Sequence, residues 1–245
     1  MVTLTHSILG TLARYPLTWL PADLVVPVLC GPVRGSKWIV GSARHAYWLG
    51  TYEYYKQKLI AKELSTGSVF YDLGANAGFY TLLAAKRATA GKVYAFEPLP
   101  RNIEFLRRHL ELNQIRNAGV LELAVSDVAG PALFQEAGNS FMGRLEGGGN
   151  LNVLTATLDG LLQQGKILPP SVIKIDVEGA ELLALRGSRE IFRQFRPVLF
   201  LATHGREVHA ECVRLLASWG HECKDLGDGA CKDSGEIIAR YRPSS

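Results

Sequence analysis

The regular alternation of short apolar segments with amphipathic helical segments, which starts at Ser68, constrains the fold of this 245-residue chain more than any other feature. Seven short segments rich in apolar or β-branched residues are predicted to be strands, at 69–73, 92–96, 119–125, 171–175, 197–203, 222–226 and 236–241. Helical spacing predicts helices between them, at 78–87, 101–113, 181–195 and 207–219. This order is typical of an α/β fold with a doubly wound, mostly parallel sheet covered on both faces. The last strand is expected to be antiparallel because only a short connection precedes it.

Two regions depart from this alternation. Residues 1–60 are unusually rich in tryptophan and tyrosine, and we expect them to form a helical N-terminal cap packed against a sheet domain at 61–245. Residues 131–152 are rich in glycine, which predicts an inserted loop or hairpin that could cover a ligand.

Composition excludes several classes of protein. The 27 basic and 23 acidic side chains leave a net charge of +4, which is too small to imply a nucleic-acid surface. The four cysteines form no C-x-x-C pair and have no histidine at zinc-ligand spacing, so we expect reduced thiols and a cytoplasmic protein. The apolar N-terminal region is interrupted by Arg14, Asp23 and several prolines, so neither a membrane span nor a signal peptide is expected. A peripheral membrane contact stays open, and the sequence does not indicate an oligomeric state.

A glycine-containing turn follows the first predicted strand, with the pattern D-x-G-x-N-x-G from Asp72 to Gly78. Gly74 and Gly78 permit a tight turn and a close approach of a ligand to the backbone. The helix that follows offers free amide groups at its N-terminus, where a carboxylate or phosphate can bind. An ordinary strand-to-helix connection would have the same glycines, so this turn alone is weak support for a ligand site.

A carboxylate at the end of the next strand strengthens the prediction of a ligand site. Glu97 follows Gly78 by nineteen residues, and a carboxylate in that place can accept hydrogen bonds from the ribose hydroxyls of a nucleoside cofactor. Both NAD and S-adenosylmethionine have such a ribose. The turn lacks the G-x-G-x-x-G spacing of dinucleotide sites, and Ser126-Asp127 offers polar groups for an adenine edge, so S-adenosylmethionine is favoured.

The sequence resembles the FkbM-type class I methyltransferases, which depend on S-adenosylmethionine. The resemblance extends from Trp48 to about Gly205. It rests on four motifs: FYDLGANAGFYT at 70–81, AFEP at 95–98, AVSD at 124–127 and IKIDVEGAE at 173–181.

The resemblance implies the seven-stranded, Rossmann-like methyltransferase sheet with S-adenosylmethionine as cofactor. It implies that the methionine end lies at Asp72, Gly74 and Asn76 in the turn that ends at Gly78, the ribose at Glu97, and the adenine beside Ser126 and Asp127. We further expect Glu53 to close over the cofactor from the cap. Members of the family resemble O-methyltransferases of sugars, polyketides and similar metabolites, so we expect a small-molecule or glycan acceptor with a free hydroxyl.

Three residues at the ends of the fourth and fifth predicted strands are the candidate catalytic groups. Asp176 and Glu178 follow the fourth strand, and His204 follows the fifth. His204 is the candidate general base because the pKa of histidine is ordinarily near neutrality. The structural alternative is that Asp176 caps the helix that follows, and that Glu178 and Glu181 complement the positive N-terminus of this helix. No third ligand for a cation bridging the two carboxylates is evident, so no metal is expected.

Two alternatives stay open beside a small-molecule O-methyltransferase. A nucleic-acid N-methyltransferase would normally have a proline–aromatic clamp after the fourth strand, where this chain has the acidic sequence DVEG at 176–179. A catalytically silent cofactor-binding subunit is the second alternative. Proteins of the family often have a glutamate two residues before the histidine of the fifth strand, whereas this chain has Ala202.

Overall fold

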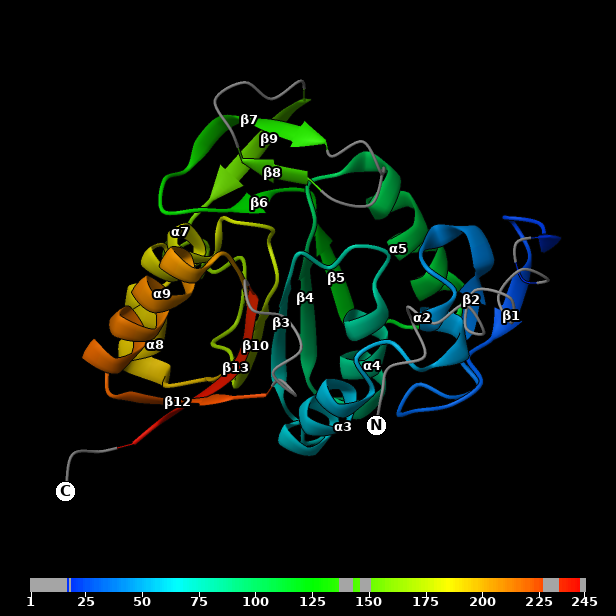
Figure 1. The fold of residues 1–245 in the computed structure, drawn as a ribbon, viewed down its shortest axis with the longest axis horizontal. Helices are drawn as coiled ribbons and strands as arrows, with labels where there is room; N and C mark the ends of the chain where they lie inside the picture. The colour runs from blue at the N-terminus through cyan, green and yellow to red at the C-terminus, as the bar shows by residue number, and fades with distance from the viewer. Residues whose placement is uncertain (1–16, 18, 137–142, 146–150, 227–233, 243–245) are drawn as a thin grey trace.

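The computed structural model describes residues 17, 19–136, 143–145, 151–226 and 234–242. Its centre is a seven-stranded sheet with the strand order β12-β13-β11-β10-β3-β4-β5 (Figure 1). The strands, in chain order, are β3 (Val69–Leu73), β4 (Lys92–Phe96), β5 (Ala118–Leu121), β10 (Val172–Ile175), β11 (Val198–His204), β12 (His221–Asp225) and β13 (Ser234–Tyr241). Neighbouring strands from β11 to β5 are parallel, whereas β13 is antiparallel to both β11 and β12. The predicted fold class and the antiparallel last strand are confirmed.

Helices cover both faces of the sheet because side chains alternate along each buried strand. Phe70 packs into one apolar core with α4 and α5, and Tyr71 packs into a second core with α7, α8 and α9. Figure 1 shows these two groups of helices on opposite sides of the sheet. The helices are α4 (Phe79–Arg87), α5 (Pro100–Leu112), α6 (Leu158–Gln163), α7 (Glu181–Arg186), α8 (Arg189–Phe195) and α9 (Arg206–Ser218). No helix in the described part of the chain has the length and hydropathy needed to cross a bilayer.

The N-terminal region packs against α4 and α5 (Figure 1). It contains helices, as expected, but also a two-stranded antiparallel sheet that the sequence did not predict. Its elements are β1 (Val25–Pro27), β2 (Lys37–Ile39), the 3₁₀ helix η2 (Val40–Ser42), α2 (Ala46–Leu49) and α3 (Tyr54–Glu63). Trp38 is fully buried in the same core as Phe79, so the cap completes one face of the sheet domain. A boundary at residue 60 stays a prediction, and α3 runs through it.

His109 of α5 joins the cap to the turn after β3. The amide of Ile39 donates to His109 Nε2 at 3.0 Å, which leaves Nδ1 protonated to donate to the carbonyl of Ala77 at 2.7 Å. Trp38 stacks on the imidazole with 3.9 Å between ring centroids. Burial lowers the pKa of His109 to about 4, so the ring is neutral in the folded chain at neutral pH.

The contribution of His109 to the stability of the fold is therefore expected to fall as the pH drops from 7.5 to 5. An unfolded chain binds a proton at His109 below a pKa of about 6.5, whereas the folded chain does not until about pH 4. This difference removes about 2 kcal/mol from the free energy of unfolding at pH 5. Urea unfolding of the wild type and of His109→Gln measures it, because glutamine has no proton to gain. Between pH 7.5 and pH 5, the free energy of unfolding of the wild type should fall by about 2 kcal/mol relative to that of His109→Gln. A difference between the two proteins that does not change with pH would contradict the low pKa of His109.

The glycine-rich insertion belongs to a second, four-stranded sheet with the order β6-β9-β7-β8. These strands are β6 (Ala124–Val125), β7 (Gly130–Glu136), β8 (Gly143–Leu145) and β9 (Leu151–Ala156). The antiparallel pairing of β7 with β8 confirms the predicted hairpin, although residues 137–142 and 146–150 lie outside the described residues. The single strand predicted at 119–125 is wrong, because β5 ends at Leu121 and β6 belongs to the other sheet. Figure 1 shows this sheet beyond the edge at which β5 ends.

The single helix predicted at 181–195 is also wrong, because the chain forms α7 and α8 with a break at Gly187. A Cβ atom at Gly187 would lie 2.0 Å from the carbonyl oxygen of Ser126, so only glycine permits this close approach. Asp159 of α6, a helix that the sequence did not predict, accepts hydrogen bonds at 3.0 Å from the amides of Glu190 and Ile191 at the start of α8. The break between α7 and α8 thus depends on two contacts with residues that are distant in sequence, Ser126 and Asp159.

Candidate functional site

The turn after β3 brings three strand ends together at the carboxyl edge of the sheet. The amides of Gly74 and Ala75 both donate to the carbonyl of Phe96 at the end of β4. Gly74 has a φ of 71°, and a Cβ atom there would lie 1.9 Å from the carbonyl oxygen of Asp176 after β10. Glycine at position 74 is therefore required by the contact with β10 as well as by the turn. Gly78, with a φ of 90°, packs in the same way against Leu106 of α5.

Glu97, the predicted ribose ligand, is buried at the end of β4 beside this turn. Its Oε2 accepts from the amide of Asn76 at 2.7 Å, and its Oε1 accepts from the amide of Leu99 at 3.0 Å and from Asn102 Nδ2 at 3.2 Å. Burial raises the pKa of Glu97, and these hydrogen bonds oppose the rise. A carboxylate has about four acceptor positions, so three donors leave Oε2 with capacity for one hydroxyl.

Asp72 lies at the end of β3, directly before the turn, and its contact with the methionine end of a cofactor stays a prediction. Its side chain is fully buried; it accepts from Thr81 Oγ1 at 2.7 Å and lies 3.2 Å from Lys174 Nζ. Lys174 Nζ also donates to the carbonyl of Gly74 at 2.8 Å and lies 3.9 Å from Asp176. Lys174 thus bridges Asp72, the turn and Asp176. Lys174 was not among the predicted site residues, although a lysine between two isoleucines in a buried strand indicates an internal charge that needs a partner.

Replacing Lys174 by methionine is expected to destabilise the fold by about 3–5 kcal/mol, because it leaves buried carboxylates without their cation. Chemical denaturation measures the loss, with Lys166→Met at an exposed position as the matched control. The double variant Asp72→Asn/Lys174→Met should regain part of the stability. Equal stability of Lys174→Met and the wild type would refute the pairing.

The other predicted cofactor residues lie in the turn, directly after β6, and in the cap. Asn76 has a φ of 51°, and its Oδ1 accepts from the amide of Ala77 at 2.7 Å. Ser126 follows β6 and is buried; its hydroxyl donates to Asp127 at 3.3 Å. Glu53 at the start of α3 accepts from the hydroxyl of Tyr80 at 2.7 Å. Direct contacts of these residues with a cofactor stay predictions.

Lys56 links the cap to strand β13 of the central sheet. It is buried and lies 2.9 Å from Glu53 and 2.8 Å from Glu236 of β13. Burial lowers the pKa of Lys56, but Glu53, Asp176 and Glu236 outweigh burial and raise it above its ordinary value. The strand register pairs Glu236 with Ala202 of β11, so a carboxylate lies beside the position at which the glutamate of the family pattern is absent.

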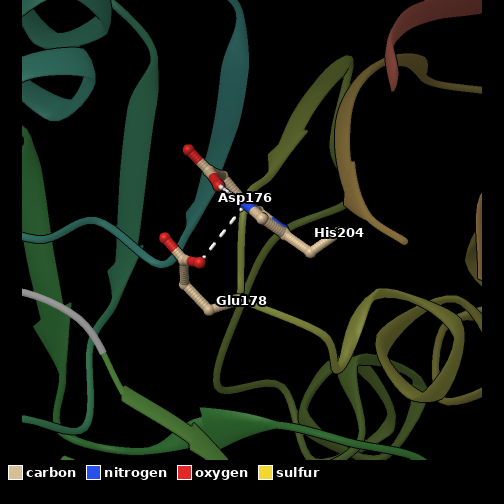
Figure 2. Close-up of side chains that lie close together, drawn as sticks. All are labelled: Asp176, Glu178 and His204. Carbon is tan, nitrogen blue, oxygen red and sulfur yellow. Dashed lines mark ion pairs between the residues drawn. The ribbon is translucent and has the colours of Figure 1, made fainter. Parts of the chain in front are cut away.

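Asp176, Glu178 and His204 form a cluster at the ends of β10 and β11, and Figure 2 shows the three side chains converging. His204 Nε2 lies 3.3 Å from Glu178 Oε2 and 4.0 Å from Asp176 Oδ1. On its other side, His204 Nδ1 lies 2.7 Å from Oε1 of Glu181, which is fully buried. The structure therefore brings together all three predicted catalytic residues. It also adds Glu181, which the sequence suggested only as a charge that complements the positive end of a helix.

The charges of this cluster differ from those expected. The hydrogen bond to Glu181 raises the pKa of His204 to about 9, so the expectation of a value near neutrality is wrong. Burial raises the pKa of Glu178. Burial also favours a higher pKa for Asp176, but Lys174, Lys56 and His204 outweigh it and lower the value. With this pKa, His204 holds a proton at neutral pH in the cluster without a ligand. Its role as general base stays a prediction.

His204 lies where it could serve as a third cation ligand beside the two carboxylates, which was not evident from the sequence. One ligand atom from each of Asp176, Glu178 and His204 lies within 4.8 Å of the others, and the three side chains are all partly exposed. Among the described residues this is the one such group of histidine, cysteine and carboxylate side chains.

Residues 72–223 match the model of the methyltransferase FkbM domain. The chain belongs to the FkbM methyltransferase family. The match includes the turn, Glu97 and the cluster of Asp176, Glu178 and His204.

Individual relatives of this FkbM chain are distant. The hexuronic acid methyltransferase AglP of Haloferax volcanii is 27% identical over 158 residues, which are 62% of this chain and 61% of that protein. The solved structure of methyltransferase FkbM from Methylobacillus flagellatus KT is 17% identical, with a TM-score of 0.51, over 81% of this chain and 56% of that one. Fibrillarin from Aeropyrum pernix, solved with natively bound S-adenosylmethionine, is 16% identical, with a TM-score of 0.50, over 76% of this chain and 75% of that one. The structural likenesses establish the fold.

Proposed function

We propose that this chain is an S-adenosylmethionine-dependent O-methyltransferase that acts on a hydroxyl of a sugar-containing acceptor. The observation that carries the proposal is the convergence of Asp176, Glu178 and His204 beside the glycine turn, in a domain of the FkbM family. The carbonyl of Asp176 packs against Gly74, so a ligand bound at the turn would lie next to the cluster.

The residues at the carboxyl edge fit S-adenosylmethionine. Glu97 Oε2 has capacity for a ribose hydroxyl, and Asp72 Oδ1 is buried and accepts no hydrogen bond among the described residues although Lys174 lies near it. Gly74 and Asn76 would lie beside the methionine end, and Ser126 and Asp127 beside the adenine. When bound, the cofactor supplies an electrophilic methyl group on a positively charged sulfur.

The cluster would receive the acceptor hydroxyl. Transfer requires that the hydroxyl oxygen is aligned with the methyl carbon and loses its proton, and alignment alone contributes roughly 7–11 kcal/mol in well-oriented reactions. The carboxylates of Asp176 and Glu178 can accept a hydrogen bond from the hydroxyl and so orient it. The proton that the hydroxyl loses on transfer would pass through the Asp176 carboxylate to solvent. His204 would keep these carboxylates in place through its contacts with them at 3.3 Å and 4.0 Å.

A sugar acceptor is supported by the likeness to a hexuronic acid methyltransferase and by the polar character of the cluster. A nucleic-acid acceptor is disfavoured because two carboxylates would repel its phosphates. Methyl-labelled cofactor, incubated separately with hexuronic-acid glycans, neutral glycans and RNA, tests the proposal. We expect label in a glycan; label in RNA alone, or in no acceptor, would overturn it.

A further inference from the structure

We propose that Asp176, Glu178 and His204 bind a divalent cation of the Mg²⁺ or Mn²⁺ class, which holds the acceptor hydroxyl. The identity of the acceptor rests on the proposed function, whereas binding of the cation does not. The three side chains come from the loop after β10 and from the end of β11, so the sheet itself positions them.

The distances from His204 to the two carboxylates match those between ligands around a small cation. Ligands about 2.1 Å from an ion lie about 3.0 Å apart at right angles and about 4.2 Å apart on opposite sides. His204 Nε2 is 3.3 Å from Glu178 Oε2 and 4.0 Å from Asp176 Oδ1, which falls between these limits. Small side-chain movements would close the three atoms around one ion, and His204 Nε2 would release its proton to solvent as the ion binds, because a histidine ligand must be neutral.

The orientation of His204 is that of a metal-binding histidine. Such a residue donates its second ring N–H to a carboxylate or carbonyl, which fixes the ring and directs the other nitrogen to the ion. Glu181 Oε1 holds Nδ1 at 2.7 Å and is itself fixed by the amide of Gly179 at 2.9 Å. Glu181 Oε2 is buried without a hydrogen-bond partner in the described structure, so this buried carboxylate is directed mainly at the imidazole.

Charge and ligand type identify the class of cation. Asp176, Glu178 and Glu181 surround a single imidazole, and Lys174 lies on the far side of Asp176 with Asp72 as its nearer partner. Two oxygen ligands and one imidazole suit Mg²⁺ or Mn²⁺ better than a thiolate-preferring ion. Three protein ligands leave positions for water and for an acceptor hydroxyl, whose proton would pass to solvent more readily once its oxygen is bound.

The test is a titration of Mn²⁺ into the chelator-treated full chain, followed by calorimetry and by electron paramagnetic resonance of the free ion. We expect one saturable site per chain, with binding weakened at least 10-fold in Asp176→Asn and His204→Gln. Glu181→Gln should weaken binding about 10- to 100-fold, as is usual for a residue that supports a ligand. Asp23→Asn, at an exposed position far from these residues in sequence, is the matched control and should bind as the wild type does.

Circular dichroism of each variant establishes that it is folded. Absence of saturable Mn²⁺ binding, or equal affinity in the wild type and in folded Asp176→Asn and His204→Gln, would overturn the cation site and leave an ion-pair cluster. Methyl transfer that persists in chelator, together with no Mn²⁺ binding, would overturn the cation while retaining the proposed function. Specific Mn²⁺ binding without methyl transfer to any acceptor would support the cation site and count against the proposed function.

Discussion

Asp176→Asn is expected to lower kcat for methyl transfer by about 10²- to 10⁴-fold, the range typical for loss of a group that assists proton removal. Asparagine keeps the size of the side chain but removes the charge that faces His204 and Lys174. Because Asp176 contacts the glycine turn through its backbone carbonyl, the affinity for S-adenosylmethionine should change by less than about threefold, a change of roughly 0.7 kcal/mol.

Single-turnover rates with saturating cofactor, and calorimetry of cofactor binding, separate the two quantities. The exposed Asp23→Asn variant is the control for the chemical change and should keep the wild-type rate. If Asp176→Asn retained the full activity of the wild type, the cluster would have no part in the reaction. If the wild type itself transferred no methyl group, the alternative of a catalytically silent subunit would gain support.

Glu97→Gln is expected to weaken S-adenosylmethionine binding by about 10- to 100-fold. The loss of a charged hydrogen bond to a ribose hydroxyl costs about 1.5–3 kcal/mol, which corresponds to this range. In addition, both oxygens of Glu97 accept from N–H groups, so an amide nitrogen in either place faces a donor.

Calorimetric titration of the cofactor into the wild type and Glu97→Gln measures the effect. Glu104→Gln, an exposed position on α5, is the matched control. Thermal unfolding without cofactor shows how much of the loss comes from local destabilisation. Unchanged affinity in a folded Glu97→Gln variant would refute the assignment of Glu97 to the ribose.

Most strand ends of the central sheet were predictable because local pattern determines them; the end of β5 was not. The segment at 92–96 is bounded by Gly91 and Glu97, and its strand bounds agree with the prediction. Asp176, Glu178 and His204 could be grouped because the carboxyl ends of neighbouring parallel strands meet at one edge. The sequence thus located the three side chains, but not their distances or their charges.

The features that the sequence did not predict depend on contacts between distant residues. The break between α7 and α8 arises from the approach of Ser126 to Gly187, and the neutral His109 owes its state to burial under Trp38. The pKa of His204 is raised by Glu181, which lies 23 positions earlier in the chain. Such contacts leave no periodic signal, because periodicity reports only which face of an element is buried.

The position of the transferred methyl group on the acceptor is the most direct test of the proposed chemistry. A hexuronic acid offers both hydroxyl and carboxylate oxygens, and mild alkali cleaves a methyl ester but not a methyl ether. With methyl-labelled S-adenosylmethionine and a uronic-acid glycan, we predict label on a ring hydroxyl that survives alkali and is absent with Asp176→Asn. Label released by alkali, or label that appears equally with Asp176→Asn, would contradict hydroxyl methylation at this cluster.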